Sequence, residues 1–257
     1  MRIILCVKQV PNDGGAVIYE KDGTLVRSGG MLNPCDSHAA SAAFAIKKAF
    51  GGEIIVLSMG AASAISALRE VLAAGADRGV LLCGREFKGS DVYATSYALS
   101  QAVKKLGGAD LILCGERTAD GGTAQTPFSL AAQLLIPAAG FIKRIVFREG
   151  ILFFIQELSG ISVEVEARFP MLAAVSKQIA PPAVASLKGY AEAAKKEICI
   201  WDSADLPDNS PRHYGLTASP TAVRSIKPLV FTAKNPPIYE TPKESAERLI
   251  AIARRFL

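Results

Sequence analysis

The sequence lacks the patterns that mark several large classes of protein. Among its 257 residues are five cysteines, none of them in a C-x-x-C pair, and only two histidines, so no spacing typical of a zinc site is present. An odd number of scattered cysteines without a disulfide pattern is typical of the reducing cytoplasm. We therefore expect a cytoplasmic protein with no bound metal.

Long hydrophobic runs and charge runs are also missing. The longest apolar segment, residues 130–142, is interrupted by Gln133, Pro137 and Gly140. It is therefore well short of the ~20 residues that a membrane helix needs. The apolar run before Lys8 is only five residues long, too short for the core of a secretory signal. The net charge of +5 comes without a run of five like charges, so neither nucleic acid nor a membrane span is expected.

Two common phosphate-binding motifs are absent as well. No G-x-G-x-x-G follows the first apolar run, and no P-loop sequence occurs, which excludes a standard Rossmann dinucleotide site and a P-loop nucleotidase. Residues Ser28-Gly29-Gly30 share S-G-G with ATP-cleaving pyrophosphatases but follow an expected hairpin at 17–26 instead of the first strand. The sequence therefore gives little support to an ATP-cleaving enzyme.

What the sequence does contain is a regular alternation of apolar runs and amphipathic stretches. Strands are expected at 2–10, 53–58, 79–83 and 111–114, and helices at 38–49, 61–74, 92–105 and from about 123. Repeated strand–helix units joined by right-handed crossovers form a parallel sheet with helices on both faces. We predict an α/β fold with a Rossmann-like parallel sheet.

The pattern changes after Pro137. Runs rich in β-branched and aromatic residues at 140–148, 151–158, 161–169 and 171–177 predict strands that extend the sheet as antiparallel pairs. Residues 202–240 contain six prolines and predict an extended arm that needs a partner surface. Thr241-Pro242-Lys243-Glu244 is a capping box that opens a helix to 256. We therefore divide the chain into an α/β domain, 1–198, and an arm with a terminal helix, 199–257.

The most informative stretch runs from 109 to 137. A strand ending at Gly115 is followed by a loop with Asp120-Gly121-Gly122, in which the two glycines can take positive φ. The next helix begins near Thr123, where free amides and the positive end of the dipole favour an anion such as phosphate. An ordinary αβ loop that carries glycines remains an alternative.

Several segments are expected to meet at one edge of this sheet. Ligands of open parallel sheets bind outside the carboxyl ends of the strands. Cys6, Met59 and Gly115 leave their strands at that edge, and Asn33 and Thr95 head helices there. This convergence predicts a single nucleotide site. No acid–base pair, nucleophile or metal cluster accompanies it, so we expect no catalytic residues.

The loop motif L-I-L-C-G-x-x-x-x-D-G-x-T-A-Q resembles the nucleotide-binding segment of the β subunit of electron transfer flavoproteins, where D-G-D-T-A-Q-x-G-P is usual. V-K-Q-V-P, N-P-x-D, V-L-S-M-G and G-x-D-x-x-A-T-S are also similar to that family, so the resemblance covers most of the chain. The chain departs from the pattern in two places. Gly122 replaces an acid, and Thr126-Pro127-Phe128 replaces x-G-P.

The resemblance implies a set of cofactor-binding residues. They are Cys6, Asn33, Asp36, Met59, Thr95, Ser96, Gly115, Asp120, Gly121, Gly122, Thr123, Ala124, Gln125 and Thr126. Without the resemblance, plainer interpretations stand beside it. Asp36 or Ser37 would cap a helix, Cys6 would be a core residue, and Met59 would fill a gap.

The resemblance also implies a function and partners. Such a β subunit pairs with an α subunit that holds FAD, and itself holds AMP or a second FAD that allows NADH-dependent bifurcation. Ala124 favours FAD, because AMP-binding members usually carry Asn at this position. Leu187 matches the apolar anchor of a loop that reaches a dehydrogenase, although Ala183-Val184 replaces the usual Arg-Tyr. The alternative is a stand-alone adenine-nucleotide-binding domain, like those of stress-response proteins, without a redox role.

Overall fold

The computed structural model describes residues 1–12, 30–223 and 240–255. The chain divides into two compact units, Met1–Arg224 and Ser225–Leu257, which are described separately. The hairpin expected at 17–26 lies outside the described residues.

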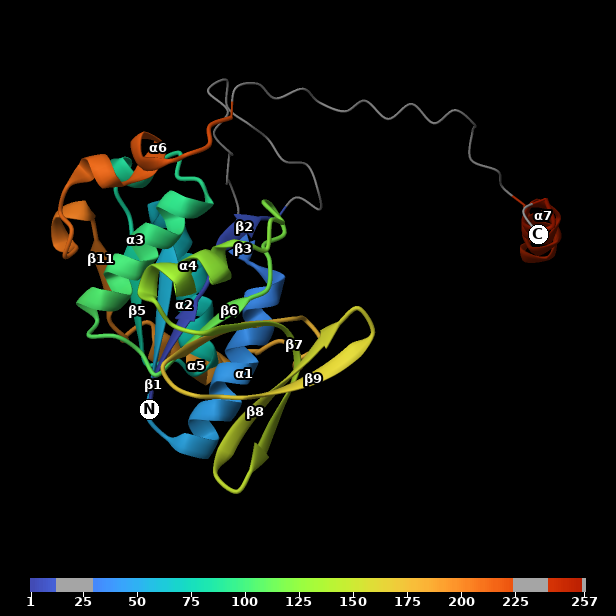
Figure 1. Ribbon diagram of the computed structural model, residues 1–257, viewed down its shortest axis with the longest axis horizontal. Coiled ribbons are helices and arrows are strands. Elements are labelled where there is room, and N and C mark those ends of the chain that lie inside the picture. Colours follow the sequence, from blue (N-terminus) through green and yellow to red (C-terminus); the bar gives the residue numbers. More distant parts are fainter. Residues whose placement is uncertain (13–29, 224–239, 256–257) are drawn as a thin grey trace. The chain divides into compact units, whose positions relative to one another are not determined.

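The first unit is built on a nine-stranded sheet with the strand order β11-β5-β4-β1-β6-β10-β7-β8-β9 (Figure 1). The strands from β11 to β7 are parallel to their neighbours, whereas β7, β8 and β9 are antiparallel. A separate antiparallel pair joins β2 to β3. This confirms the predicted fold class. The strands are β1 (Arg2–Cys6), β2 (Gln9–Pro11), β3 (Gly30–Leu32), β4 (Glu53–Met59), β5 (Arg78–Leu82), β6 (Leu111–Gly115), β7 (Ala138–Arg148), β8 (Ile151–Leu158), β9 (Ile161–Glu166), β10 (Met171–Val175) and β11 (Ile198–Trp201).

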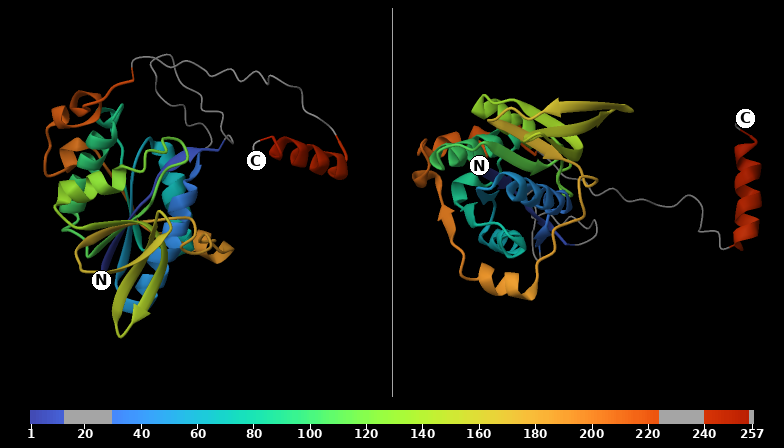
Figure 2. Two further views of the ribbon diagram at one scale, coloured as in Figure 1. Left: turned by 45° about the vertical axis from the view of Figure 1, so that its right-hand side comes forward. Right: turned by 90° about the horizontal axis from the view of Figure 1, so that it is seen from below.

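Helices cover both faces of the parallel sheet, as Figure 1 and Figure 2 show. Alternate residues of the central strands belong to two separate apolar clusters, because successive side chains of a strand point to opposite faces. Helices α1 and α2 pack on one face and α3 and α4 on the other. The helices of this unit are α1 (Pro34–Phe50), α2 (Ile65–Ala74), α3 (Val92–Lys105), α4 (Thr126–Leu134), α5 (Leu187–Ala193) and α6 (Gly215–Ala218).

Helices α3 and α1 differ in how they begin. Asp91 caps α3 by accepting a hydrogen bond from the Ala94 amide at 3.0 Å. Helix α1 starts earlier than the sequence suggested, since Asn33 is its N-cap residue and Pro34 its first residue. The expectation that Asp36 or Ser37 caps this helix is therefore wrong. Both residues lie inside the first turn of α1.

The antiparallel extension holds one surprise. Strands β7, β8 and β9 form the predicted meander, which projects from the sheet in Figure 1. Strand β10, however, lies between β6 and β7 and is parallel to both. Its residues are all buried, which explains why its sequence, Met-Leu-Ala-Ala-Val, is apolar throughout.

Residues beyond 198 continue the first unit. Strand β11 pairs with β5, so the predicted boundary between residues 198 and 199 falls at the start of a strand of the sheet. Tyr214 is 1% exposed, and its ring contacts Phe87 edge-on and Tyr97. The expected structureless arm is therefore wrong for the part up to 219. Isolated apolar residues between the prolines make these contacts. They show no helical or strand periodicity, so the sequence pattern did not predict the packing.

In the second unit the described residues form helix α7 (Pro242–Ala253). The predicted capping box is confirmed: the Thr241 hydroxyl accepts a hydrogen bond from the Glu244 amide, and the Glu244 carboxylate accepts one from the Thr241 amide. Within the described ranges, no helix has the length and apolar character that crossing a membrane requires.

Candidate functional site

The carboxyl edge of the sheet brings three predicted segments together. Strand β1 lies between β4 and β6 in the sheet. The three strands β1, β4 and β6 end at Cys6, Met59 and Gly115. At Gly115 the first turn of α1 approaches so closely that a Cβ would stand 2.4 Å from the Asp36 carboxylate and 2.6 Å from the Cys35 Cβ. Only glycine permits this approach. Gly115 thus lets α1 close against the end of β6.

Asn33 joins the start of α1 to the loop after β6. Its side chain is fully buried; Nδ2 donates to the Arg117 carbonyl and Oδ1 accepts from the Ala119 amide, both at 3.1 Å. Asn33 makes no capping hydrogen bond to its own helix. Its side-chain amide instead holds the loop at 116–125, which we call the nucleotide loop.

Asp36 joins the ends of two strands. One carboxylate oxygen accepts from the Lys8 amide at 2.8 Å and the other from the Gly115 amide at 3.2 Å. Burial raises the pKa of Asp36 to about 7, against the opposing effect of hydrogen bonds from Asn33, Lys8 and Gly115. Asp36 therefore acts on the site through the backbone just after β1 and at the end of β6.

A residue that the sequence analysis did not single out completes this framework. The Lys8 ammonium contacts both carboxylate oxygens of Asp120, at 2.8 and 2.7 Å. The Asp120 side chain is only 4% exposed, and Lys8 holds the pKa of this carboxyl below its usual value although burial acts in the opposite direction. The signal in the sequence was the first charged residue after the apolar run of β1, in V-K-Q-V-P.

The backbone of the nucleotide loop leaves several amides without a protein acceptor just before a helix. Gly122 has φ 64° and Ala124 has φ 56°. Gly121, which was also expected to take positive φ, does not. In the part of the chain that the structure describes, the amides of Thr123, Ala124 and Gln125 donate to no protein acceptor. Helix α4 begins at once with Thr126, so its positive end adds to these amides.

Cys6 lies at the end of β1 opposite Cys114 of β6. A hydrogen bond between the two thiols, together with burial, raises the pKa of Cys114 well above its usual range. A thiol that stays protonated is a poor nucleophile, so Cys114 packs as a small apolar group.

Met59, Thr95 and Ser96 lie on β4 and α3. Met59 lines a small recess with Lys8 and Gln9, beside the end of β4. Thr95 and Ser96 are the fourth and fifth residues of α3. The Ser96 hydroxyl is buried, where it lies 2.6 Å from the Ser129 hydroxyl in the first turn of α4. Ser96 thus joins two helix starts.

Leu187 is placed elsewhere. It begins α5 and is 91% exposed, and the neighbouring Val184 is 87% exposed. Helix α5 packs closely on the last turn of α2, where a Cβ on Gly189 would stand 2.2 Å from the Ala73 carbonyl oxygen. Leu187 therefore presents an apolar side chain away from the nucleotide loop.

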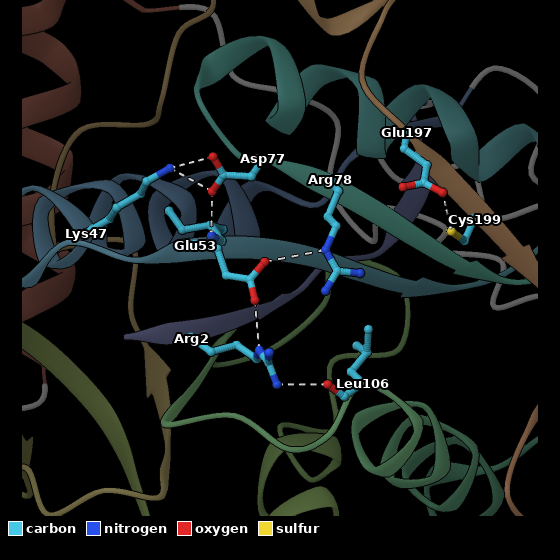
Figure 3. Close-up of polar contacts among 9 residues, drawn as sticks. Arg2, Lys47, Glu53, Asp77, Arg78, Leu106, Glu197 and Cys199 are labelled. Atoms are coloured by element: carbon cyan, nitrogen blue, oxygen red, sulfur yellow. Dashed lines mark hydrogen bonds and ion pairs between the residues drawn. The ribbon is translucent and has the colours of Figure 1, made fainter.

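The opposite, amino edge of the sheet has a cavity of about 680 Å³ lined in part by Arg2, Glu53 and Asp110. Its charged groups are already engaged with one another, as Figure 3 shows for Arg2 and Glu53. The Arg2 amide also donates to Asp110 at 2.6 Å, and its guanidinium donates to the Leu106 carbonyl at 2.9 Å. This cavity therefore offers a ligand few unsatisfied groups.

Comparison with known proteins places the chain in one family. Residues 22–206 match the electron transfer flavoprotein domain. The chain is 38% identical over 232 residues to caffeyl-CoA reductase-Etf complex subunit CarD of Acetobacterium woodii, covering 89% of this chain and 88% of that one. It is 38% identical over 235 residues to electron transfer flavoprotein subunit beta of Megasphaera elsdenii, covering 88% and 87%. It is 35% identical over 243 residues to protein FixA of Azorhizobium caulinodans, covering 88% and 84%. The chain thus belongs to the electron transfer flavoprotein family.

Proposed function

We propose that this chain is the β subunit of a heterodimeric electron transfer flavoprotein that carries electrons between a dehydrogenase and a second redox partner. The observation that carries the proposal is the nucleotide loop, where the free amides of residues 123–125 stand at the carboxyl edge beside the start of α4. Family membership favours this function over a stand-alone nucleotide-binding domain.

In this proposal the nucleotide loop holds an adenine nucleotide by its phosphate. The amides of Thr123, Ala124 and Gln125 would donate to phosphate oxygens, and the positive end of α4 adds attraction for the same charge. Asn33 and Asp36 would fix the loop and the strand ends without contacting the ligand, since their polar atoms are taken by backbone groups.

We propose FAD as the nucleotide, in preference to AMP. Ala124 has a shorter side chain than the Asn of AMP-binding members, and so leaves room for the rest of a dinucleotide. When bound, a flavin supplies one- and two-electron redox chemistry. The chain itself binds and orients that flavin, and NADH is the proposed hydride donor. Five free cysteines agree with a cytoplasmic location for the complex.

Two surfaces are proposed to meet partners. Leu187, which is 91% exposed at the start of α5, would contact the dehydrogenase. Helix α7 exposes Leu249, Ile250 and Ile252, which are 67%, 54% and 46% accessible. We propose that α7 and the segment before it contact the α subunit, since large apolar side chains gathered in the open on one helix mark an interaction surface.

The experiment is to purify the chain together with its α subunit, release the nucleotides with acid, and count FAD and AMP per heterodimer by chromatography. Two FAD are expected. One FAD and one AMP would contradict the FAD assignment but keep the nucleotide site. A single FAD with no second adenine nucleotide would overturn the proposed function of the nucleotide loop.

A matched variant tests the role given to Ala124. Ala124→Asn should fold normally, because Asn tolerates positive φ. Its expected result is a loss of FAD from this subunit with AMP in its place. Unchanged FAD content would contradict the explanation by side-chain size.

A further inference from the structure

Lys8 stands where three elements of the site meet. Its amide donates to the Asp36 carboxylate at 2.8 Å, and its carbonyl accepts from the Asn33 amide at 2.9 Å. The backbone of Lys8 is therefore fixed against the first turn of α1. Its side chain extends from this fixed base to Asp120 in the nucleotide loop, 112 residues later in the sequence.

Asp120 passes the effect of this contact to the loop backbone. Besides Lys8, its carboxylate accepts a hydrogen bond from the Gly121 amide at 2.7 Å. The Gly122 amide donates to the Thr118 carbonyl at 3.0 Å. The turn at 118–122 is thus tied to itself and to Lys8 immediately before the free amides.

This part of the loop needs such support. Ala124 has φ 56°, a conformation that costs a residue with a Cβ about 1–2 kcal/mol. Strained residues of this kind persist when their surroundings hold them. Asn33 holds one side of the turn through the Arg117 carbonyl and the Ala119 amide. The contact of Lys8 with the buried Asp120 carboxylate holds the turn as well.

We propose that Lys8 is a positioning residue for the nucleotide: by holding Asp120, it keeps the amides of residues 123–125 presented to a phosphate. This inference rests on the proposed function, because it takes an adenine nucleotide as the ligand. It adds a residue that acts through the loop, as distinct from one that contacts the ligand.

The alternative role for the pair is a purely electrostatic effect on the phosphate. It predicts the opposite change in nucleotide binding when Asp120 loses its charge. If Lys8 only attracted the phosphate and Asp120 only repelled it, removing the Asp120 charge would strengthen nucleotide binding. If the pair positions the loop, removing either partner weakens binding. In addition, removing both should cost little more than removing one, since the two residues act as one unit.

The experiment measures nucleotide dissociation from the purified heterodimer after dilution, for the parent and for the variants Lys8→Gln, Asp120→Asn and the double variant. We expect each single variant to release the nucleotide about tenfold faster, and the double variant to match the singles. Lys8→Arg should stay within about threefold of the parent, because Arg pairs with a carboxylate through two hydrogen bonds. Lys8→Met, which keeps the apolar stem, replaces Lys8→Gln if that variant fails to fold.

The chain provides a matched control at the amino edge. Lys47 contacts both oxygens of Asp77 at 2.7 Å, and its side chain is 28% exposed against 33% for Lys8. Lys47→Gln should leave the dissociation rate unchanged. Parent-like dissociation in Lys8→Gln, or tighter binding in Asp120→Asn, would overturn the positioning role while leaving the proposed function intact. A parent heterodimer with no nucleotide on this chain would overturn the proposed function instead.

Discussion

The amino and carboxyl edges of the parallel sheet both carry charged and polar side chains, but these side chains have different roles. At the amino edge, Arg2, Glu53 and Arg78 form ion pairs with side chains that are 32–39% exposed (Figure 3). At the carboxyl edge, Asn33 is 0% exposed and Asp36 4%. Exposed ion pairs contribute little to stability, whereas buried polar groups are costly to disturb. Burial, and not the type of residue, therefore separates the edge where we propose a nucleotide site from the edge that only closes the sheet.

The largest effect in this comparison is expected from Asn33→Ala. The variant loses two hydrogen bonds to the nucleotide loop and leaves a cavity, so unfolding should become easier by about 2–4 kcal/mol. Nucleotide release should also become more than tenfold faster. Chemical denaturation and nucleotide retention of the heterodimer measure both. Asp77→Ala at the amino edge removes hydrogen bonds to Lys47 and to the Ile54 amide. If it released nucleotide equally fast, the two edges would not differ as described.

A second, smaller effect concerns pH. Burial raises the pKa of Asp36 to about 7 in the folded chain, above its ordinary value of 3.8. Between these values the folded state holds more protons than the unfolded state, so the contribution of Asp36 to stability falls as pH rises toward 7. The stability advantage of the parent over Asp36→Asn should therefore shrink between pH 5 and pH 8, by on the order of 2 kcal/mol. Urea denaturation of both proteins at the two pH values tests this. An advantage that grows with pH would contradict it.

The smallest effect is expected from Glu53→Gln at the amino edge. Hydrogen bonding from Arg2 lowers the pKa of Glu53, so its contribution is present above its unfolded pKa and is lost as pH falls through the folded one. Because this side chain is 37% exposed, the loss at neutral pH should be below about 1 kcal/mol, and salt should reduce it further. Thermal melting at low and high salt measures it. Faster nucleotide release in this variant would remove the distinction between the edges.

The sequence predicted the parts of this molecule that depend on local pattern. Periodicity and turn residues place β1, β4, β5, β6 and helix α3, since those signals lie within each segment, whereas the break between β1 and β2 and the strand β3 were not predicted. The contact of Lys8 with Asp120 could not be predicted in this way, because it joins residues 112 positions apart. Nor could the orientation of Asn33, which as an N-cap residue would ordinarily cap its own helix.

The nucleotide loop shows the same division. The D-G-G motif correctly indicated a turn with positive φ at Gly122, but the second such residue is Ala124 and not Gly121. Alanine carries no signal for this conformation, so only the surrounding contacts select it. The predicted binding residues themselves stay predictions until a nucleotide is measured on the chain.

The position of β10 and β11 has a consequence for how the protein is made. In chain order the first four parallel strands, β1, β4, β5 and β6, are complete by Gly115, yet both flanks of that group stay open until β10 and β11 arrive much later. A chain still on the ribosome therefore carries unpaired strand edges for more than 50 residues of synthesis, the condition that invites edge-to-edge aggregation. Shortening this protein at residue 198 would make that temporary exposure of β5 permanent.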